Sequence, residues 1–134
     1  MLTLFIALEI IGPCSQKPLH RVNLLEGLTV GEATVKTLSA RRIPFQGNDR
    51  AINTIVNIPT QDQTLEILSN TNMRAYGWCF DVDGEIPEEY ADQIPLHEGM
   101  KKIRWFHAYA EMKDGQWVSQ CQETAKLKPT FLCD

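Results

Sequence analysis

The segment YGWCFDVDG, residues 76–84, holds the side chains whose types and spacing could do chemistry. Asp81 and Asp83 stand two residues apart, as the carboxylates of calcium loops often do. An EF-hand loop also needs a glycine at its sixth position, but counting from Asp81 puts Ile86 there, and Gly84 comes too early. Aspartate followed by glycine tolerates the positive φ of a tight turn. The segment therefore predicts a strand that ends in a turn at Asp83 and Gly84, and no metal site.

The cysteines could form disulfides, hold zinc or act as nucleophiles. They are Cys14, Cys79, Cys121 and Cys133. Structural zinc sites favour ligands two to four residues apart, so these wide spacings argue against zinc. We predict one disulfide between Cys79 and Cys121 and another between Cys14 and Cys133, because the second would tie the two ends of the chain together. Four buried thiols in a cytosolic protein remain the alternative.

The predicted disulfides bear on localisation, because bridges persist in oxidising compartments. We therefore expect a secreted or periplasmic protein whose export signal is absent from this chain. The apolar residues 1–11 do not match such a signal, since no basic residue opens them and Glu9 interrupts them. They are also far short of the ~20 apolar residues that span a bilayer, and we expect no transmembrane segment. A buried first strand is the better interpretation.

Catalytic constellations are not recognisable in the sequence. The histidines, His20, His97 and His107, are scattered, and neither H-x-x-x-H nor G-x-S-x-G occurs. Gly27 and Gly31 lack the Lys and Ser or Thr that follow in a phosphate-binding loop. We therefore expect neither an enzyme nor a cofactor. The alternative is a thiol-dependent enzyme that uses Cys79 or Cys121 with His107, which a bridge at Cys79 would abolish.

Aromatic residues gather between positions 76 and 117. They are Tyr76, Trp78, Phe80, Tyr90, Trp105, Phe106, Tyr109 and Trp117. One interpretation is a core of large rings. The other is a surface for a flat ligand or a partner chain, formed by Tyr76, Trp78, Trp105 and Tyr109, because aromatic rings bury much area at little entropic cost. Alternation along a strand allows both, since Trp105 and Phe106 must point to opposite sides.

The length and the net charge of the chain limit the number of domains and the kinds of partner to be expected. A chain of 134 residues is the usual size of one domain with one core. The net charge of −4 and the pI near 5.3 argue against a nucleic-acid partner, which requires a surplus of clustered Lys and Arg. The expected partner is an unknown small molecule or protein.

In the first half of the chain, the sequence predicts two strands, then a helix, then a third strand. Residues 2–11 and 20–25 read as a hairpin. A helix follows over 29–42, in which Thr29 caps the first turn and Glu32 can reach back to the Thr29 amide. The helical stripe is Val30, Ala33, Thr34, Thr37 and Leu38. Residues 51–59 read as a strand that places Ile52, Thr54, Val56 and Ile58 on one face and Ile55 on the other.

The second half predicts more strands. Extended segments are expected at 63–68, 76–82, 101–112 and 117–122, with Asp-Gly at the centre of the last hairpin. The loop over 85–100 should be anchored by Ile86, Tyr90, Ile94 and Leu96. Residues 1–134 then form a single α+β domain, a β-grasp-like mixed sheet packed against one helix, with 123–134 as a C-terminal extension.

The order of these motifs resembles the transcobalamin-like domain of unknown function, which is related to the C-terminal domain of cobalamin carriers. The resemblance runs from Leu2 to Met112 and includes the segments LTVGEATVKTL and INTIVNI. The segment YGWCFDVDG is similar to the family pattern W-x-x-x-V-N-G, and PLHEGMKKIRWFHA is similar to dGD-x-I-x-W-x-Y. Asp83 replaces the usual Asn, Gly99-Met100 replaces Gly-Asp, and strand 117–122 lies outside the pattern. The resemblance implies a β-grasp fold and, at most, a ligand-binding or adhesive role. Cobalamin contact does not carry over, because carriers use a second, helical domain.

We therefore predict a non-catalytic extracytoplasmic binding or interaction module. The alternatives are the thiol-dependent enzyme described above and a structural or assembly domain of a surface protein.

Overall fold

The computed structural model describes residues 3–23 and 25–133. Met1, Leu2, Leu24 and Asp134 lie outside these ranges, so the predicted strands over 2–11 and 20–25 can be compared only for their other residues. The fold is mixed α+β: one curled sheet carries most of the strands, and few helices accompany it. This confirms the predicted class.

The main sheet has the order β3-β2-β9-β8-β7, with β10 also paired to β9. Its strands are β2 (Ala7–Ile11), β3 (His20–Val22), β7 (Leu65–Ile67), β8 (Met73–Val82), β9 (Lys102–Lys113) and β10 (Gln116–Glu123). β2 runs parallel to β9, and the other pairs are antiparallel. The predicted hairpins of β2 with β3 and of β9 with β10 are both present.

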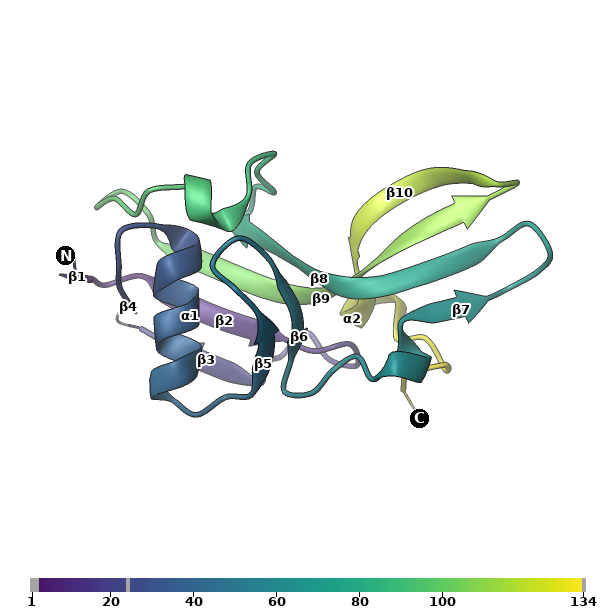
Figure 1. Cartoon of the computed structure of the whole chain (residues 1–134), viewed down its shortest axis with the longest axis horizontal. Helices are drawn as coiled ribbons and strands as arrows, with labels where there is room; N and C mark the ends of the chain where they lie inside the picture. Colours follow the sequence, from purple (N-terminus) through teal and green to yellow (C-terminus); the bar gives the residue numbers. More distant parts are fainter. Residues whose placement is uncertain (1–2, 24, 134) are drawn as a thin grey trace.

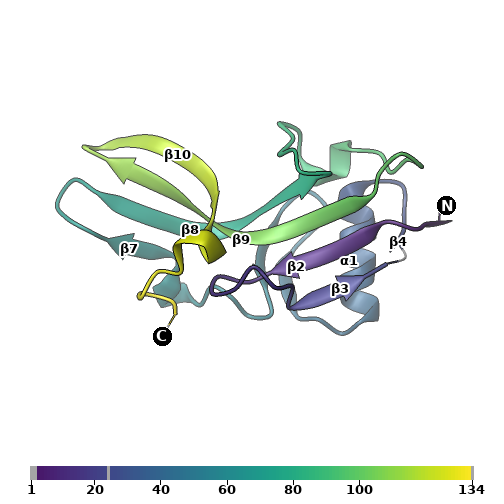
Figure 2. The same ribbon diagram turned by 180° about the vertical axis from the view of Figure 1, so that it is seen from behind.

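β8 and β9 form a long twisted ribbon that joins two halves of the molecule (Figure 1). β2 pairs with the first part of β9, and β10 pairs with the last part. We call the end with β2 and β3 the proximal half and the end with β7 and β10 the distal half. The ribbon twists strongly between them, as the two opposite views show (Figures 1 and 2).

One helix covers the proximal half. This is α1 (Val30–Ala40), and the amide of Glu32 donates to the Thr29 hydroxyl at 3.1 Å, as the sequence predicts. The reciprocal bond differs from the prediction, because the Glu32 carboxylate accepts from the amide of Leu28 at 3.3 Å instead of that of Thr29. The hydrogen bonds at the start of α1 therefore extend back to Leu28, one residue before Thr29. All five predicted stripe residues of the helix are buried.

The smaller elements complete the chain. They are β1 (Thr3–Leu4) paired with β4 (Leu25–Glu26), β5 (Phe45–Gly47) paired with β6 (Ile52–Ile55), the 3-10 turns η1 (Gln61–Gln63) and η2 (Ala91–Gln93), and the short helix α2 (Thr124–Leu127).

The predicted strand over 51–59 is wrong in its second half. β6 ends at Ile55, because Val56 and Asn57 adopt φ of 51° and 62° and turn the chain back, so that Ile58 bridges to Ile55. Ile52 and Ile55 are buried in the same core, and the pairing of β6 with β5 shifts register between Thr54 and Ile52, so the predicted division of faces also fails. β-branched residues favour strands, but tertiary packing overrides that preference here.

The main core lies between α1 and the proximal half of the sheet. Trp105 and Phe80 stack in it with ring centroids 4.9 Å apart. The loop that was expected to anchor through Ile86 and Tyr90 does not, because both are 51% exposed. Ala91 and Leu96 are buried in their place. The core therefore takes the predicted anchor Leu96, with the predicted anchor Ile94 packed partly buried against it, and it also takes Ala91 and Met100, which no pattern singled out.

Candidate functional site

The predicted turn at the end of β8 is present. Asp83 and Gly84 have φ of 51° and 86°. One carboxylate oxygen of Asp83 accepts from the backbone amides of Lys101 and Lys102, at 3.0 and 2.8 Å. Within the described ranges, no group of three or more His, Cys, Asp or Glu side chains could hold a metal ion. The Asp83 carboxylate thus ties β8 to the start of β9.

Both predicted disulfides are formed. Cys14 joins Cys133 with Cα atoms 5.6 Å apart, and Cys79 joins Cys121 at 5.8 Å. None of the four sulfur atoms is a free thiol. Cys79 is opposite Phe106 in the β8–β9 ladder, whereas His107 is opposite Trp78, so Cys79 and His107 project from opposite faces of the sheet. This geometry does not support a Cys79–His107 couple.

The aromatic residues assigned to a ligand share one face of the sheet, because residues directly opposite in an antiparallel ladder project to the same side. They are Tyr76, Trp78, Trp105 and Tyr109. Two of them are interior, since Trp105 is 2% and Tyr76 is 6% exposed. The indole N–H of Trp105 donates to the Thr34 hydroxyl beneath α1 at 3.0 Å. Trp105 therefore belongs to the core, and of the four predicted residues only Trp78 and Tyr109 are partly exposed.

The C-terminal segment covers the distal part of that aromatic face. Phe131 stacks on Tyr76 with ring centroids 5.8 Å apart and an interplanar angle of 17°. Cys133 holds the segment to Cys14. In the two opposite views, α1 and the C-terminal segment lie on opposite sides of the ribbon (Figures 1 and 2). Since both cover the same face of the strands, the twist has turned that face over between the two halves.

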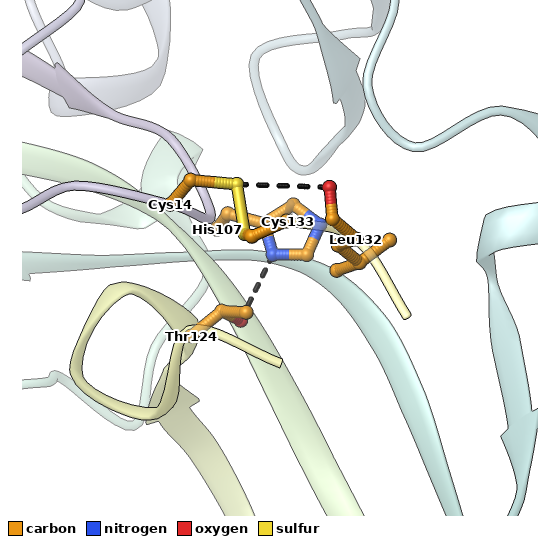
Figure 3. The surroundings of a disulfide bond; sticks show 5 residues. All are labelled: Cys14, His107, Thr124, Leu132 and Cys133. Carbon is orange, nitrogen blue, oxygen red and sulfur yellow. Dashed lines mark hydrogen bonds between the residues drawn. A yellow bond between two sulfur atoms is a disulfide. The ribbon is translucent and has the colours of Figure 1, made fainter. Parts of the chain in front are cut away.

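His107 lies beneath this segment, next to the Cys14–Cys133 bridge (Figure 3). Its ring is fully buried, and Nδ1 is 2.9 Å from the Thr124 hydroxyl. Its Nε2 is buried and finds no hydrogen-bond partner within residues 3–23 and 25–133. Burial lowers the pKa of His107 to about 4. The imidazole is therefore neutral at pH 7, and one of its nitrogens is an unused polar atom in the interior.

An ion-pair cluster occupies the opposite face of the sheet. Arg104 lies between Asp81 at 3.3 Å and Glu123 at 3.2 Å, and Lys126 approaches Glu123 at 3.6 Å. These side chains line an open hollow of about 930 Å³. Burial raises the pKa of Asp81, and the nearby Arg104 opposes that shift. Since each of these charges has an opposite charge within 4 Å, the cluster fits a structural role that links β8, β9 and β10.

Beyond this cluster, the same face becomes an apolar trough. Its side chains come from the distal strands and project to one side by their register. We call these residues the apolar trough: Leu65, Ile67, Met73, Ala75, Gly77, Ala110, Met112 and Trp117. None of them is charged. The outer strands supply the rim, where Ile67 is 66% and Trp117 is 47% exposed.

The floor of the trough is made of small residues from β8 and β9. A hollow of about 250 Å³ lies over Ala75, Gly77 and Ala110, and a second of about 490 Å³ borders Ile67 and Met73. A Cβ added to Gly77 would meet no atom of the described residues within 4 Å. The space above the floor is therefore open, and a protruding apolar group can approach the strands closely.

Sequence reasoning missed the trough. The signal was present in the segment MRAYGWC, residues 73–79, where apolar residues follow one another on both faces of a strand. Alternation shows which residues share a face, but it does not show which face another element covers.

Comparisons with known proteins identify no relative: no family model, no curated protein and no solved structure matches this chain. The transcobalamin-like resemblance therefore stays a prediction. Across the residues that the structure describes, no helix is both long and apolar enough to cross a membrane.

Proposed function

We propose that this protein is a non-catalytic extracytoplasmic binding module that packs its apolar trough against an apolar, uncharged ridge on a partner protein. The exposure of the trough carries the proposal. Contiguous exposed apolar surface is uncommon on monomeric proteins and marks interaction sites. Ile67 and Trp117 stand in solvent at its rim although each could bury a large apolar area.

The shape of the trough favours a protein over a small molecule. Sites for small molecules are concave and usually enclose roughly 300–1,000 Å³. The two hollows of the trough, of about 250 and 490 Å³, are both open and lie along one face of the distal strands, so they do not enclose a ligand. An open sheet face of this kind is better suited to bind the surface of another protein than to enclose a small molecule.

The chemistry of the trough defines the partner's surface. A charge brought against these side chains would lose its water without gaining an opposite charge. The two methionines, Met73 and Met112, can adjust their shape to an apolar side chain. We therefore expect aliphatic or aromatic residues on the partner.

Two disulfides support an extracytoplasmic location, because such bridges are typical of oxidising compartments. The strand order supports a β-grasp relationship: an opening hairpin, one helix across the sheet, and a parallel pair, β2 with β9, inside an otherwise antiparallel sheet. The bridge between Cys79 and Cys121 also supports a role without thiol catalysis.

Site-specific photo-crosslinking in the cells that make the protein tests the proposal. A benzophenone amino acid replaces Ile67 or Trp117 at the rim, and in a matched control it replaces Arg41, which is exposed at the end of α1. We expect one discrete adduct from each rim position and none from the control. Adding Ala110→Arg should abolish the adduct, because it places a long charged side chain on the floor.

Equal adducts from the rim and from Arg41, or an adduct that persists with Ala110→Arg, would contradict the proposal. An adduct of twice the mass of the chain would identify the partner as a second copy. That outcome would favour the alternative of an assembly domain.

A further inference from the structure

We propose that residues 130–133, which we call the C-terminal cover, close a second binding site that takes a planar aromatic group carrying a hydrogen-bonding substituent. This site lies on the opposite face from the apolar trough, so it stands or falls independently of the proposed function. Phe131 occupies this site in the structure, and its ring indicates that the site accepts a planar aromatic group. Its ring stacks on Tyr76 although the phenylalanine remains 38% exposed.

The cover is attached to the rest of the protein at few points. The amides of Leu132 and Cys133 both donate to the carbonyl of Pro129, at 3.0 and 2.8 Å, so these bonds lie within the C-terminal segment. Within the part of the chain that the structure describes, its other polar contact is a long one of 3.7 Å between the Cys14 sulfur and the Leu132 carbonyl oxygen. The Cys14–Cys133 bridge is therefore its principal attachment.

A hinge precedes the cover. Pro129 is buried, and Lys128 adopts a left-handed φ of 48° at the end of α2. The Lys128 amide donates to the Thr124 carbonyl at 2.9 Å. α2 and Pro129 can therefore stay in place when residues 130–133 move.

The surface beneath the cover is built from rings. The His107 ring lies 5.7 Å from Tyr76 and 5.6 Å from Trp78, with an edge-to-face geometry to the indole. The ring centroid of Tyr109 lies 6.2 Å from that of Tyr76. The Tyr76 hydroxyl donates to Glu66 at 2.7 Å, which fixes the ring on which Phe131 stacks. An aromatic ligand would meet a preformed stacking surface.

His107 supplies a polar contact for such a ligand. Its buried Nε2 has no hydrogen-bond partner among the described residues, and it points toward Leu132 and Cys133 (Figure 3). Buried polar atoms are nearly always hydrogen-bonded, because an unpaired one costs about 1–3 kcal/mol. A planar ligand that replaces Phe131 and hydrogen-bonds to Nε2 would remove that cost. This is the reason for expecting a substituted aromatic group.

Thiol–disulfide exchange opens the cover. Cys14 is exposed, so the thiolate of a dithiol can attack its sulfur, and Cys133 leaves as a thiolate. The second thiol of the reagent then displaces Cys14 from the mixed disulfide. The protein gains two electrons and the dithiol is oxidised to a cyclic disulfide. Cys79 and Cys121 are less exposed than Cys14 and should react later.

The test uses indole as the probe, because it is planar and carries an N–H group. NMR titrations compare the full chain with the double variant Cys14→Ser/Cys133→Ser. We expect the variant to bind indole at least tenfold more tightly than the unchanged protein, with the largest shifts at His107 and Tyr76. Cyclohexanol, which is similar in size but not planar, should bind neither.

Two further variants separate the cover from general loosening. Cys79→Ser/Cys121→Ser removes the other bridge and leaves the cover fastened, so it should bind indole no better than the unchanged protein. Phe131→Ala keeps both bridges and vacates the stacking position, so it should bind with intermediate affinity. It also keeps the proposal testable if the Cys14→Ser/Cys133→Ser variant fails to fold.

Opening should also be visible without a ligand, because the His107 pKa should rise toward its ordinary value of about 6.5 once water reaches Nε2. The proposal is overturned if the folded Cys14→Ser/Cys133→Ser variant and Phe131→Ala both fail to gain affinity. An equal gain in Cys79→Ser/Cys121→Ser would overturn it as well.

Discussion

The two halves of the molecule share the strands β8 and β9 but differ in what covers them. In the proximal half, an eleven-residue helix lies across one face, and the side chains beneath it form the main core. In the distal half, a short C-terminal segment covers that face, and the apolar trough on the other face is uncovered. The comparison teaches that apolar side chains build a core only where another element packs on them.

The two halves are therefore stabilised differently. The proximal half depends on burial, with Leu25, Val30 and Ile103 each fully buried. The distal half depends on cross-links: Cys79–Cys121 spans from β8 to β10, and Cys14–Cys133 fastens the C-terminal segment. A disulfide restricts the unfolded chain and stabilises a region that has little core of its own.

The largest expected effect contrasts two tryptophans. Trp105→Ala should lower the free energy of unfolding by about 3–5 kcal/mol, because it leaves a cavity beneath α1 and a hydroxyl at Thr34 without its donor. Trp117→Ala should lower it by less than about 1 kcal/mol, because that ring is 47% exposed. Urea unfolding followed by circular dichroism measures both. Similar losses in the two variants would remove the distinction between the halves.

The second prediction concerns pH and the junction between the halves. The His107 pKa is lowered to about 4, against about 6.5 in an unfolded chain. Between those values the unfolded chain takes up a proton and the folded protein does not, so stability falls as the pH drops. The loss should reach about 3 kcal/mol over this interval. His107→Gln should flatten the dependence of the urea midpoint on pH.

Asp81 acts in the opposite direction and provides the control. Its pKa is raised in the folded protein, so it favours folding as the pH falls toward its own titration. Measuring His107→Gln in an Asp81→Asn background removes this contribution. If the slope between pH 6.5 and 4 stays unchanged in the double variant, the assignment to His107 is wrong.

The smallest expected effect compares the two Asp-Gly turns, one in each half. Asp83 and Asp114 have similar φ, 51° and 53°. Among the described residues, only the Asp83 carboxylate of the two accepts from backbone amides. Asp83→Ala should cost about 2–3 kcal/mol and Asp114→Ala about 1 kcal/mol, because both lose the turn preference and only the first loses two hydrogen bonds.

Asp83→Asn sharpens this prediction, because asparagine keeps the turn preference and one acceptor oxygen. Its loss should stay within about 1 kcal/mol, and calcium should not change the melting temperature of either protein. Stabilisation by calcium that disappears in Asp83→Asn would show that the acids hold a cation after all.

Much of the fold could be predicted because its determinants are local. Thr29 and Glu32 lie within one helical turn, and Asp114 with Gly115 fixes the last hairpin through backbone preference alone. The division of β8 into two faces follows from strict alternation. These features need no knowledge of distant segments.

The wrong predictions concern residues whose conformation or burial depends on contacts with segments distant in the sequence. Val56 has a high preference for strands, yet it adopts a positive φ where the chain turns beside Pro44, whose carbonyl accepts from its amide. Tyr90 looks like a core residue by type, but Arg50 lies over its exposed ring at 4.0 Å. Neither neighbour is close in sequence, so no local pattern could reveal it.

The sequence by itself determined the capped helix, the Asp-Gly turns and the alternation of the long strands, because each depends on residues a few positions apart. Only the tertiary structure decided what covers the aromatic face of the twisted ribbon. In the proximal half α1 covers this face, and in the distal half Phe131 covers it. It also decided that the apolar trough is uncovered. Side-chain alternation assigns residues to faces, but what covers a face is set by contacts between segments distant in the chain.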